Sequence, residues 1–433
     1  MERQEYMELL TGQIRCKRAI PLVTKELEIH IEEQKADFMK EGATEQEAEE
    51  AAVREMGDPV EVGIWMDGIH RPKMNWRIIF FIGVISAACM GVWYYLNIQV
   101  AKEAADFPEL FVRYLFYTAA GYAAMIGICY IDYTWFASRA KKIMLLYCGL
   151  LAGVLMSFEP VNDIFDEMCS SAVWLMAYLF IPLYCSVLYS YRKTGIRGIV
   201  KGIVWMLPIV ISLLICGNKM ELLIFLVVLA AILSYAVYAG TFQIPARKTL
   251  AVICSVTVLF FAGMLMLEDF GGYKGAATQS EYRKVMAQSK DTVQEVLLYS
   301  RAIGRAKEST GAVMGTFELA GVFPAEDGFT LLYLAVIFGT FVSAVAVLII
   351  AALLLEMISL TVKQKNRLGR LMGIGCGLVL IVHAAGYVLE NAGFIAPEQL
   401  YCPFTVGGRE VIVTYVLLGV MLSIYRYQSI SEA

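Results

Sequence analysis

Long apolar runs separated by short polar stretches make up most of the chain after Trp76. About 20 apolar residues cross a bilayer as a helix, so run length predicts about ten spans. Their expected extents are 78–99, 114–133, 143–158, 172–191, 199–216, 222–240, 249–267, 329–358, 371–389 and 411–424. The apolar share of 58% and the mean hydropathy of +0.61 exceed what a soluble domain can bury. We therefore predict an all-α, polytopic membrane protein.

Lysine and arginine residues fall in alternate loops between these runs. They are Arg139, Lys141 and Lys142, then Arg192, Lys193, Arg197 and Lys201, then Arg247 and Lys248, then Lys363, Lys365, Arg367 and Arg370. Cytoplasmic loops carry the excess of positive charge, so these loops are expected inside. The acidic loop before residue 172 has no lysine or arginine and is expected outside. Both termini then lie in the cytoplasm, which requires an even number of spans.

The first 75 residues form a polar prefix with helical patterns. Thr44 and Glu47 have the spacing of a capping box, and Asp58 followed by Pro59 predicts the start of the next helix. An earlier helix is expected over 22–40. Its apolar side carries Leu27, Ile31 and Phe38. We predict a small cytoplasmic helical bundle over 1–75, followed by a transmembrane domain over 76–433.

The end of this prefix, EEAAVREMGDPVEVG, is similar to the helical prefix found ahead of permease-like proteins in Gram-positive bacteria. The resemblance implies no chemistry. A docking or regulatory module and a solvated helical cap that aids insertion both fit this sequence.

Histidine and cysteine residues give no metal-binding pattern. The three histidines lie far apart, and the ten cysteines show no CxxC spacing. His383 lies in an apolar span, where we expect it to be packed or hydrogen-bonded in the core.

One long polar break interrupts the spans, over residues 268–328. Charge counting places this loop outside the cell, and it ends in Glu326 and Asp327 at the membrane edge. A carboxylate in that position could act as a general base on a substrate at the outer surface. The loop is therefore where we expect chemistry.

The C-terminal third carries the most informative motifs. A basic loop at 363–370 is followed by a span, Asn391 and Gly393, Pro403-Phe404, Gly407-Gly408, a last span and Arg426. This order resembles the C-terminal end of the SEDS family (FtsW, RodA and SpoVE). The ten-span count and the long outer loop between the seventh and eighth spans fit the same family.

The resemblance implies a function. SEDS proteins polymerise glycan strands from a polyprenyl-pyrophosphate-linked disaccharide peptide in the bacterial plasma membrane. The expected partners are therefore this lipid-linked peptidoglycan precursor, a class B penicillin-binding protein (a transpeptidase) and membrane lipids, with no nucleic acid. The family has an aspartate just before the eighth span, and Asp327 is its nearest match here. Asp327 is thus the expected catalytic base.

Other charged residues of the outer surface are candidates for substrate binding. They are Arg301, Arg305, Lys307, Glu326 and Arg409. Cations there could hold the departing pyrophosphate, with a divalent cation as a further candidate. Each residue also has a simpler interpretation: the two carboxylates could cap the eighth helix, the loop cations could be only solvated, and Arg409 could pair with Glu410.

The chain also departs from the family pattern. The family's Gln-Pro-Ser-Glu element has no counterpart between spans three and four, and the step from Pro324 to Asp327 is shorter than usual. Two functions therefore stay open: a peptidoglycan glycosyltransferase, or a catalytically inactive SEDS-like scaffold that regulates division or sporulation machinery. A lipid or solute transporter is a weaker third, because no run of intramembrane ionisable residues is present.

Overall fold

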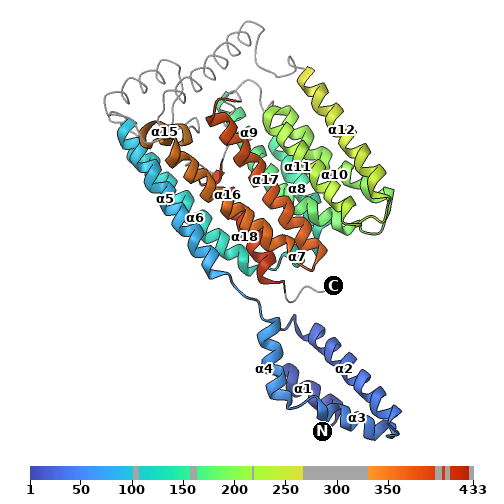
Figure 1. Cartoon of the computed structure of the whole chain (residues 1–433). Coiled ribbons are helices and arrows are strands. Elements are labelled where there is room, and N and C mark those ends of the chain that lie inside the picture. The colour runs from blue at the N-terminus through green and yellow to red at the C-terminus, as the bar shows by residue number, and fades with distance from the viewer. Residues whose placement is uncertain are drawn as a thin grey trace. The chain divides into compact units, whose positions relative to one another are not determined.

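The chain forms two compact units in a computed structural model that describes residues 1–100, 107–156, 163–216, 219–266, 330–394, 402–404 and 410–428. The first unit comprises residues 1–75 together with the short segments 364–366 and 424–433. The second comprises residues 76–363 and 367–423. Figure 1 shows that both units are built from helices.

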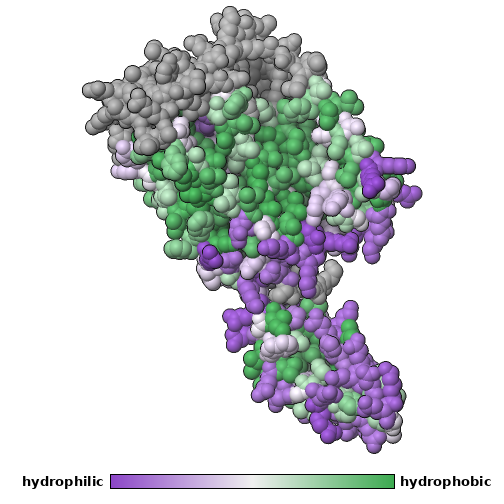
Figure 2. Space-filling model, in the orientation of Figure 1, coloured by the Kyte–Doolittle hydropathy of each residue, from purple (hydrophilic) through white to green (hydrophobic). Residues whose placement is uncertain are grey.

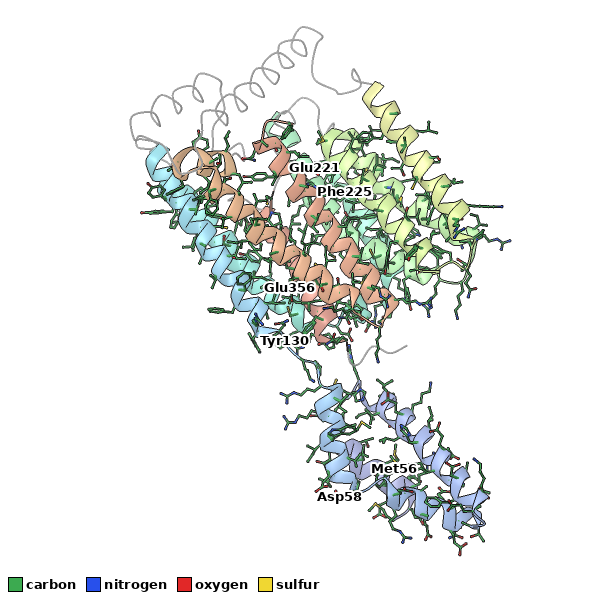
Figure 3. All side chains as sticks on the ribbon, viewed as in Figure 1. Met56, Asp58, Tyr130, Glu221, Phe225 and Glu356 are labelled. Atoms are coloured by element: carbon green, nitrogen blue, oxygen red, sulfur yellow. The ribbon has the colours of Figure 1, made fainter. Side chains whose placement is uncertain are left out.

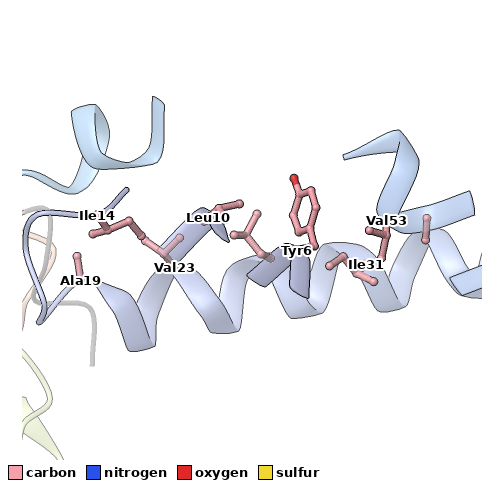
Figure 4. Packing of buried hydrophobic residues seen from close by; sticks show 9 residues of the cluster. Tyr6, Leu10, Ile14, Ala19, Val23, Ile31 and Val53 are labelled. Carbon is pink, nitrogen blue, oxygen red and sulfur yellow. The ribbon is translucent and has the colours of Figure 1, made fainter. Parts of the chain in front are cut away.

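Four helices make up the first unit: α1 (Arg3–Gly12), α2 (Ile20–Lys40), α3 (Glu45–Glu55) and α4 (Pro59–His70). Tyr6 and Leu10 of α1 pack with Val23 and Ile31 of α2 and Val53 of α3 in one apolar core (Figure 4). The expected apolar side of α2 is confirmed. Leu27 and Ile31 are buried, and Phe38 packs against the same core. The helix begins two residues earlier than predicted.

Local capping chemistry sets the boundaries of α3 and α4. The Thr44 backbone N–H donates to Glu47 Oε2 over 3.0 Å, and the Glu47 N–H donates to Thr44 Oγ1 over 3.4 Å. The predicted capping box is therefore present, and its hydrogen bonds lower the pKa of Glu47. Asp58 accepts from two backbone N–H groups at the start of α4, with Pro59 in the first turn.

Replacing Thr44 with alanine removes the side-chain half of this box. A lost N-cap costs about 1 kcal/mol, so amide hydrogen-exchange protection in α3 should fall about fivefold in the full-length protein. Thr44→Ser keeps the hydroxyl and should retain most of the protection. Equal protection in the wild type and Thr44→Ala would show that α3 does not depend on its cap.

The second unit is a bundle of apolar helices. Its helices are α5 (Trp76–Val100), α6 (Phe107–Tyr130), α7 (Tyr133–Ser138), α8 (Ala140–Met156), α9 (Asp163–Ser190), α10 (Ile196–Ile215), α11 (Lys219–Tyr238), α12 (Ala246–Met266), α15 (Thr330–Phe338), α16 (Thr340–Val362), α17 (Arg367–Asn391) and α18 (Glu410–Arg426). Eight described helices are long and apolar enough to cross a membrane, and Val411–Arg426 is a shorter apolar helix. The predicted polytopic, all-α architecture is confirmed.

The observed helices differ from the predicted extents by a few residues at most ends, and three differences have an identifiable structural feature behind them. Helix α6 ends at Tyr130 rather than at residue 133, because Asp132 accepts from the Thr134 N–H and caps the short helix α7. Helix α9 begins at Asp163, nine residues before the apolar run. The span expected over 329–358 is two helices, because Gly339 has a φ of 97° and separates α15 from α16.

Helix α17 lies in the middle of the bundle, where it packs against α9, α11 and α16 (Figure 1). Glycines on α17 allow this close approach. A Cβ at Gly373 would lie 2.2 Å from the Thr361 Cβ, and one at Gly377 would lie 2.3 Å from Ile358 Cγ1. Small residues let membrane helices pack closely, which explains the approach of α16 to α17, and Gly375 allows the same toward Cys185 of α9 and Ile232 of α11.

The loop lysines and arginines of the second unit lie beside aromatic rings. The Arg139 guanidinium is 4.8 Å from the Trp135 ring centroid, and Lys141 Nζ is 4.4 Å from that of Tyr191. Hydrophilic residues gather at one end of the apolar bundle in Figure 2. Aromatic and basic residues together are typical of a membrane interface.

Candidate functional site

The predicted site residues lie outside the described part of the chain. These are Asp327, Glu326, Arg301, Arg305, Lys307 and Arg409. Their roles stay predictions. Residues 267–329 connect α12 to α15, and the structure describes the adjoining ends of both helices. These helix ends define the frame of the candidate site.

Asn391 connects one of these helix ends, the start of α15, to the end of α17. Its Oδ1 accepts from the backbone N–H of Leu332 over 3.1 Å, in the first turn of α15. Its Nδ2 donates to the Tyr387 carbonyl over 3.0 Å, one turn back on α17. The side chain is 4% exposed. The amide therefore fixes the start of α15, three residues after Asp327 in the chain, to the end of α17.

A second contact holds the two halves of the broken span together. The Ser343 hydroxyl in α16 donates to the Leu331 carbonyl in α15 over 2.9 Å. Leu331 and Leu332 are both buried, so the first turn of α15 has neighbours on several sides. This hydrogen bond crosses the break at Gly339 and ties α16 back to the first turn of α15.

The Pro403-Phe404 motif packs back into the bundle. Phe404 is buried, has a φ of 71°, and its ring centroid lies 6.0 Å from that of Tyr415 in α18. The Tyr415 hydroxyl in turn donates to Ser86 Oγ of α5 over 2.5 Å. The motif thus anchors the segment before α18, and Phe404 serves as a packing residue there.

A buried polar cluster joins α9, α11 and α17. The Trp174 indole N–H donates to Glu221 Oε1 over 2.8 Å, and Glu221 Oε2 lies 3.4 Å from His383 Nε2. The Tyr178 hydroxyl is 2.7 Å from the same histidine nitrogen. Glu221 is 3% exposed and His383 is fully buried. Figure 3 shows Glu221 and Phe225 near one end of the bundle.

Aromatic rings enclose this cluster. The Trp174 and Tyr178 ring centroids are 4.5 Å apart, and the Phe225 ring centroid is 6.2 Å from that of His383. An ionisable group inside an apolar bundle needs such partners, because an unsatisfied polar group there is costly. The expectation that His383 is a hydrogen-bonded core residue is confirmed. Its pairing with Glu221 was not predicted, because Glu221 comes one residue before the apolar run expected over 222–240, whereas α11 begins at Lys219 and includes it.

Comparison with known proteins identifies the fold. No protein-family model and no curated protein match this chain. A subunit of a peptidoglycan synthase complex, solved to describe how polymerization and crosslinking are coordinated, is 17% identical with a TM-score of 0.58. The match covers 82% of this chain and 99% of that one. The rod shape-determining protein RodA of Thermus thermophilus, crystallised as an aspartate-to-alanine variant, is 16% identical with a TM-score of 0.51, covering 82% and 98%.

This chain is therefore a multi-pass membrane protein with the fold of a peptidoglycan synthase subunit. More specifically, it has the fold of RodA, a SEDS protein, as the C-terminal motifs predicted.

Asn391→Ala should destabilise the contact between α15 and α17, because it leaves the buried Leu332 N–H without its side-chain acceptor. Such a loss costs about 1–3 kcal/mol and should lower the Tm of the purified protein in detergent by several degrees. Thr257→Ala removes only a bond within α12 and should leave the Tm nearly unchanged. An Asn391→Ala protein as stable as the Thr257 variant would argue against this role.

Glu221→Leu should lower the Tm by a similar amount, because it strips Trp174 and His383 of their shared carboxylate. Glu221→Gln retains an oxygen that can accept from the indole N–H and should be milder. Glu356 provides the matched control. It is an exposed glutamate of α16, labelled in Figure 3, so Glu356→Gln should have no effect. If all three variants melted alike, the cluster would not stabilise the bundle.

Proposed function

We propose that this protein is a peptidoglycan glycosyltransferase of the SEDS type. The observation that carries the proposal is the fold, which the chain shares with RodA and with a peptidoglycan synthase subunit over nearly the full length of both. Fold alone does not define chemistry, so the proposal also depends on the residues at the end of the outer loop.

The proposed base is Asp327. It would take the proton of an acceptor sugar hydroxyl while that oxygen attacks the anomeric carbon of the lipid-linked donor. The bond from the anomeric carbon to the pyrophosphate oxygen breaks, and the polyprenyl pyrophosphate leaves with the electron pair. Asn391 supports this assignment because it fixes the first turn of α15, just after Asp327. A base must be held within hydrogen-bond reach of its proton.

Nearby cations would stabilise the leaving group. We assign Arg301, Arg305, Lys307 and Arg409 to the pyrophosphate and Glu326 to the substrate sugars. A divalent cation bound to the pyrophosphate is a further candidate for stabilising this charge.

The proposed setting is the bacterial plasma membrane, with both termini in the cytoplasm. The alternate basic loops support this orientation, since positive loops stay inside. The proposed partner is a class B penicillin-binding protein, which would crosslink the strands that this protein makes.

Purified protein should polymerise labelled lipid-linked disaccharide peptide when a class B transpeptidase is present. Asp327→Ala should reduce product at least a hundredfold, because general base catalysis contributes about 10²–10⁴. Asp291→Ala, which removes a carboxylate from the same outer loop, should retain activity.

Two results would contradict the proposal. Activity that survives in Asp327→Ala would remove this residue from the chemistry. A folded wild-type protein that makes no product with any transpeptidase would favour the inactive scaffold, which the missing Gln-Pro-Ser-Glu element already makes the second candidate.

A further inference from the structure

Helix α4 has one packed side and one exposed apolar side. Gly63 lies against α1 so closely that a Cβ there would be 2.6 Å from the Leu10 carbonyl oxygen. On the other side, Ile64 is 60% exposed and Trp65 is 64% exposed, with Val60 and Ile69 at 40% each. We call these four side chains the α4 apolar face.

The α4 apolar face is unusual for a water-soluble unit. At 3.6 residues per turn its four members lie on one half of the helix, where a solvated helix would carry polar residues. Glu61, in the first turn, is the one exposed charged side chain of α4, and it lies on the same half of the helix, between Ile64 and Trp65. Figure 2 shows hydrophobic surface on the part of this unit that α4 forms. Exposed apolar side chains gathered on one half of a helix indicate a surface that binds a partner.

Basic residues flank the later turns of α4. Residues 9–25 and 68–77 contain no acidic residue, and their cations are Arg15, Lys17, Arg18, Lys25, Arg71, Lys73 and Arg77. The Arg15 backbone N–H donates to Asp67 Oδ1 over 2.9 Å, so the loop between α1 and α2 lies beside α4. His70 Nε2 is 3.5 Å from Glu26 Oε2, which brings the start of α2 to the same end.

Acidic residues gather at the opposite end of the unit. They are Glu41, Glu45, Glu47, Glu49, Glu50 and Glu55, around the loop between α2 and α3 and along α3. Lys35, Lys40 and Arg54 lie among these carboxylates, and Asp67 and Glu26 lie at the basic end. The charge is nevertheless unevenly distributed, so a negatively charged partner is favoured at the end that carries the last turns of α4 over the acidic end.

The covalent chain limits how far α4 can be from the membrane. Five residues, 71–75, connect His70 to Trp76, where the first span begins. Even fully extended, this linker reaches only about 20 Å. The lipid head groups at the membrane surface where the first span begins are therefore always within reach of the last turn of α4.

We infer that the α4 apolar face lies on the anionic surface of the membrane that the first span enters. Tryptophan is favoured at the head-group level, and isoleucine and valine gain by entering the acyl boundary. The flanking lysines and arginines would meet lipid phosphates, and each such cation favours an anionic surface about fivefold. This inference does not depend on the proposed glycosyltransferase activity.

A second copy of the chain is a less suitable occupant. A stable protein interface buries about 800 Å² on each partner, and the 12-residue helix α4 presents only four apolar side chains. Pairing two copies through the α4 apolar face would also bring their basic residues, which carry like charge, close together. A lipid surface has the opposite charge and is already present beside the linker.

Photocrosslinking in the full-length protein tests this inference. Trp65→p-benzoyl-phenylalanine should form phospholipid adducts, detected by mass, in nanodiscs that contain phosphatidylglycerol. Ile29→p-benzoyl-phenylalanine is the matched control, because Ile29 is 48% exposed on α2 and outside the α4 apolar face. It should form few adducts. Yield at position 65 should fall several-fold in discs of phosphatidylcholine alone.

Charge variants sharpen the test. Lys17→Gln with Arg18→Gln should lower the lipid adduct at position 65 several-fold, whereas Lys40→Gln with Arg54→Gln, at the acidic end, should not. Equal lipid labelling at positions 65 and 29 would overturn the inference. So would the absence of adducts at position 65, or crosslinks there to a second copy or to another protein in place of lipid.

Discussion

A polar group inside a bilayer must find its partner within the protein, and the arrangement around α17 follows from this constraint. His383 on α17 lies against Glu221 of α11 and Tyr178 of α9, which ties three helices at one level of the bundle. Asn391, two turns further along α17, satisfies the first turn of α15. The glycines of α17 let these neighbours approach closely enough for such contacts.

Features set by neighbouring residues could be predicted from the sequence. The capping box at Thr44 and the start of α4 at Asp58 use hydrogen bonds within a few residues, and both are present. The early start of α9 was not predicted from hydropathy, although its cause is local. Asp163 and the acidic residues after it interrupt hydropathy but favour a helix N-terminus, so the helix continues beyond its apolar run.

Features that depend on contacts between residues far apart in the chain could not be predicted from the sequence. Gly339 interrupts one long apolar run, and its φ of 97° depends on how α15 meets α16 and Asn391. The partners Glu221 and His383 lie on separate spans, and helix order alone does not show which spans touch. For the candidate site, Asn391 was singled out only as part of the motif order that carries the family resemblance, and its acceptor role toward Leu332 became visible only in the fold.

A shared fold at a sequence identity of 16–17% is consistent with the weak demand that a bilayer places on most side chains. A lipid-facing position needs only to be apolar, so many sequences give the same spans, and the fold by itself is weak evidence of chemistry. Contacts made by polar side chains are more informative, because each costs free energy when left unpaired. Asn391 is such a residue: its amide fixes the first turn of α15 to the end of α17, and α15 begins three residues after Asp327, the proposed base.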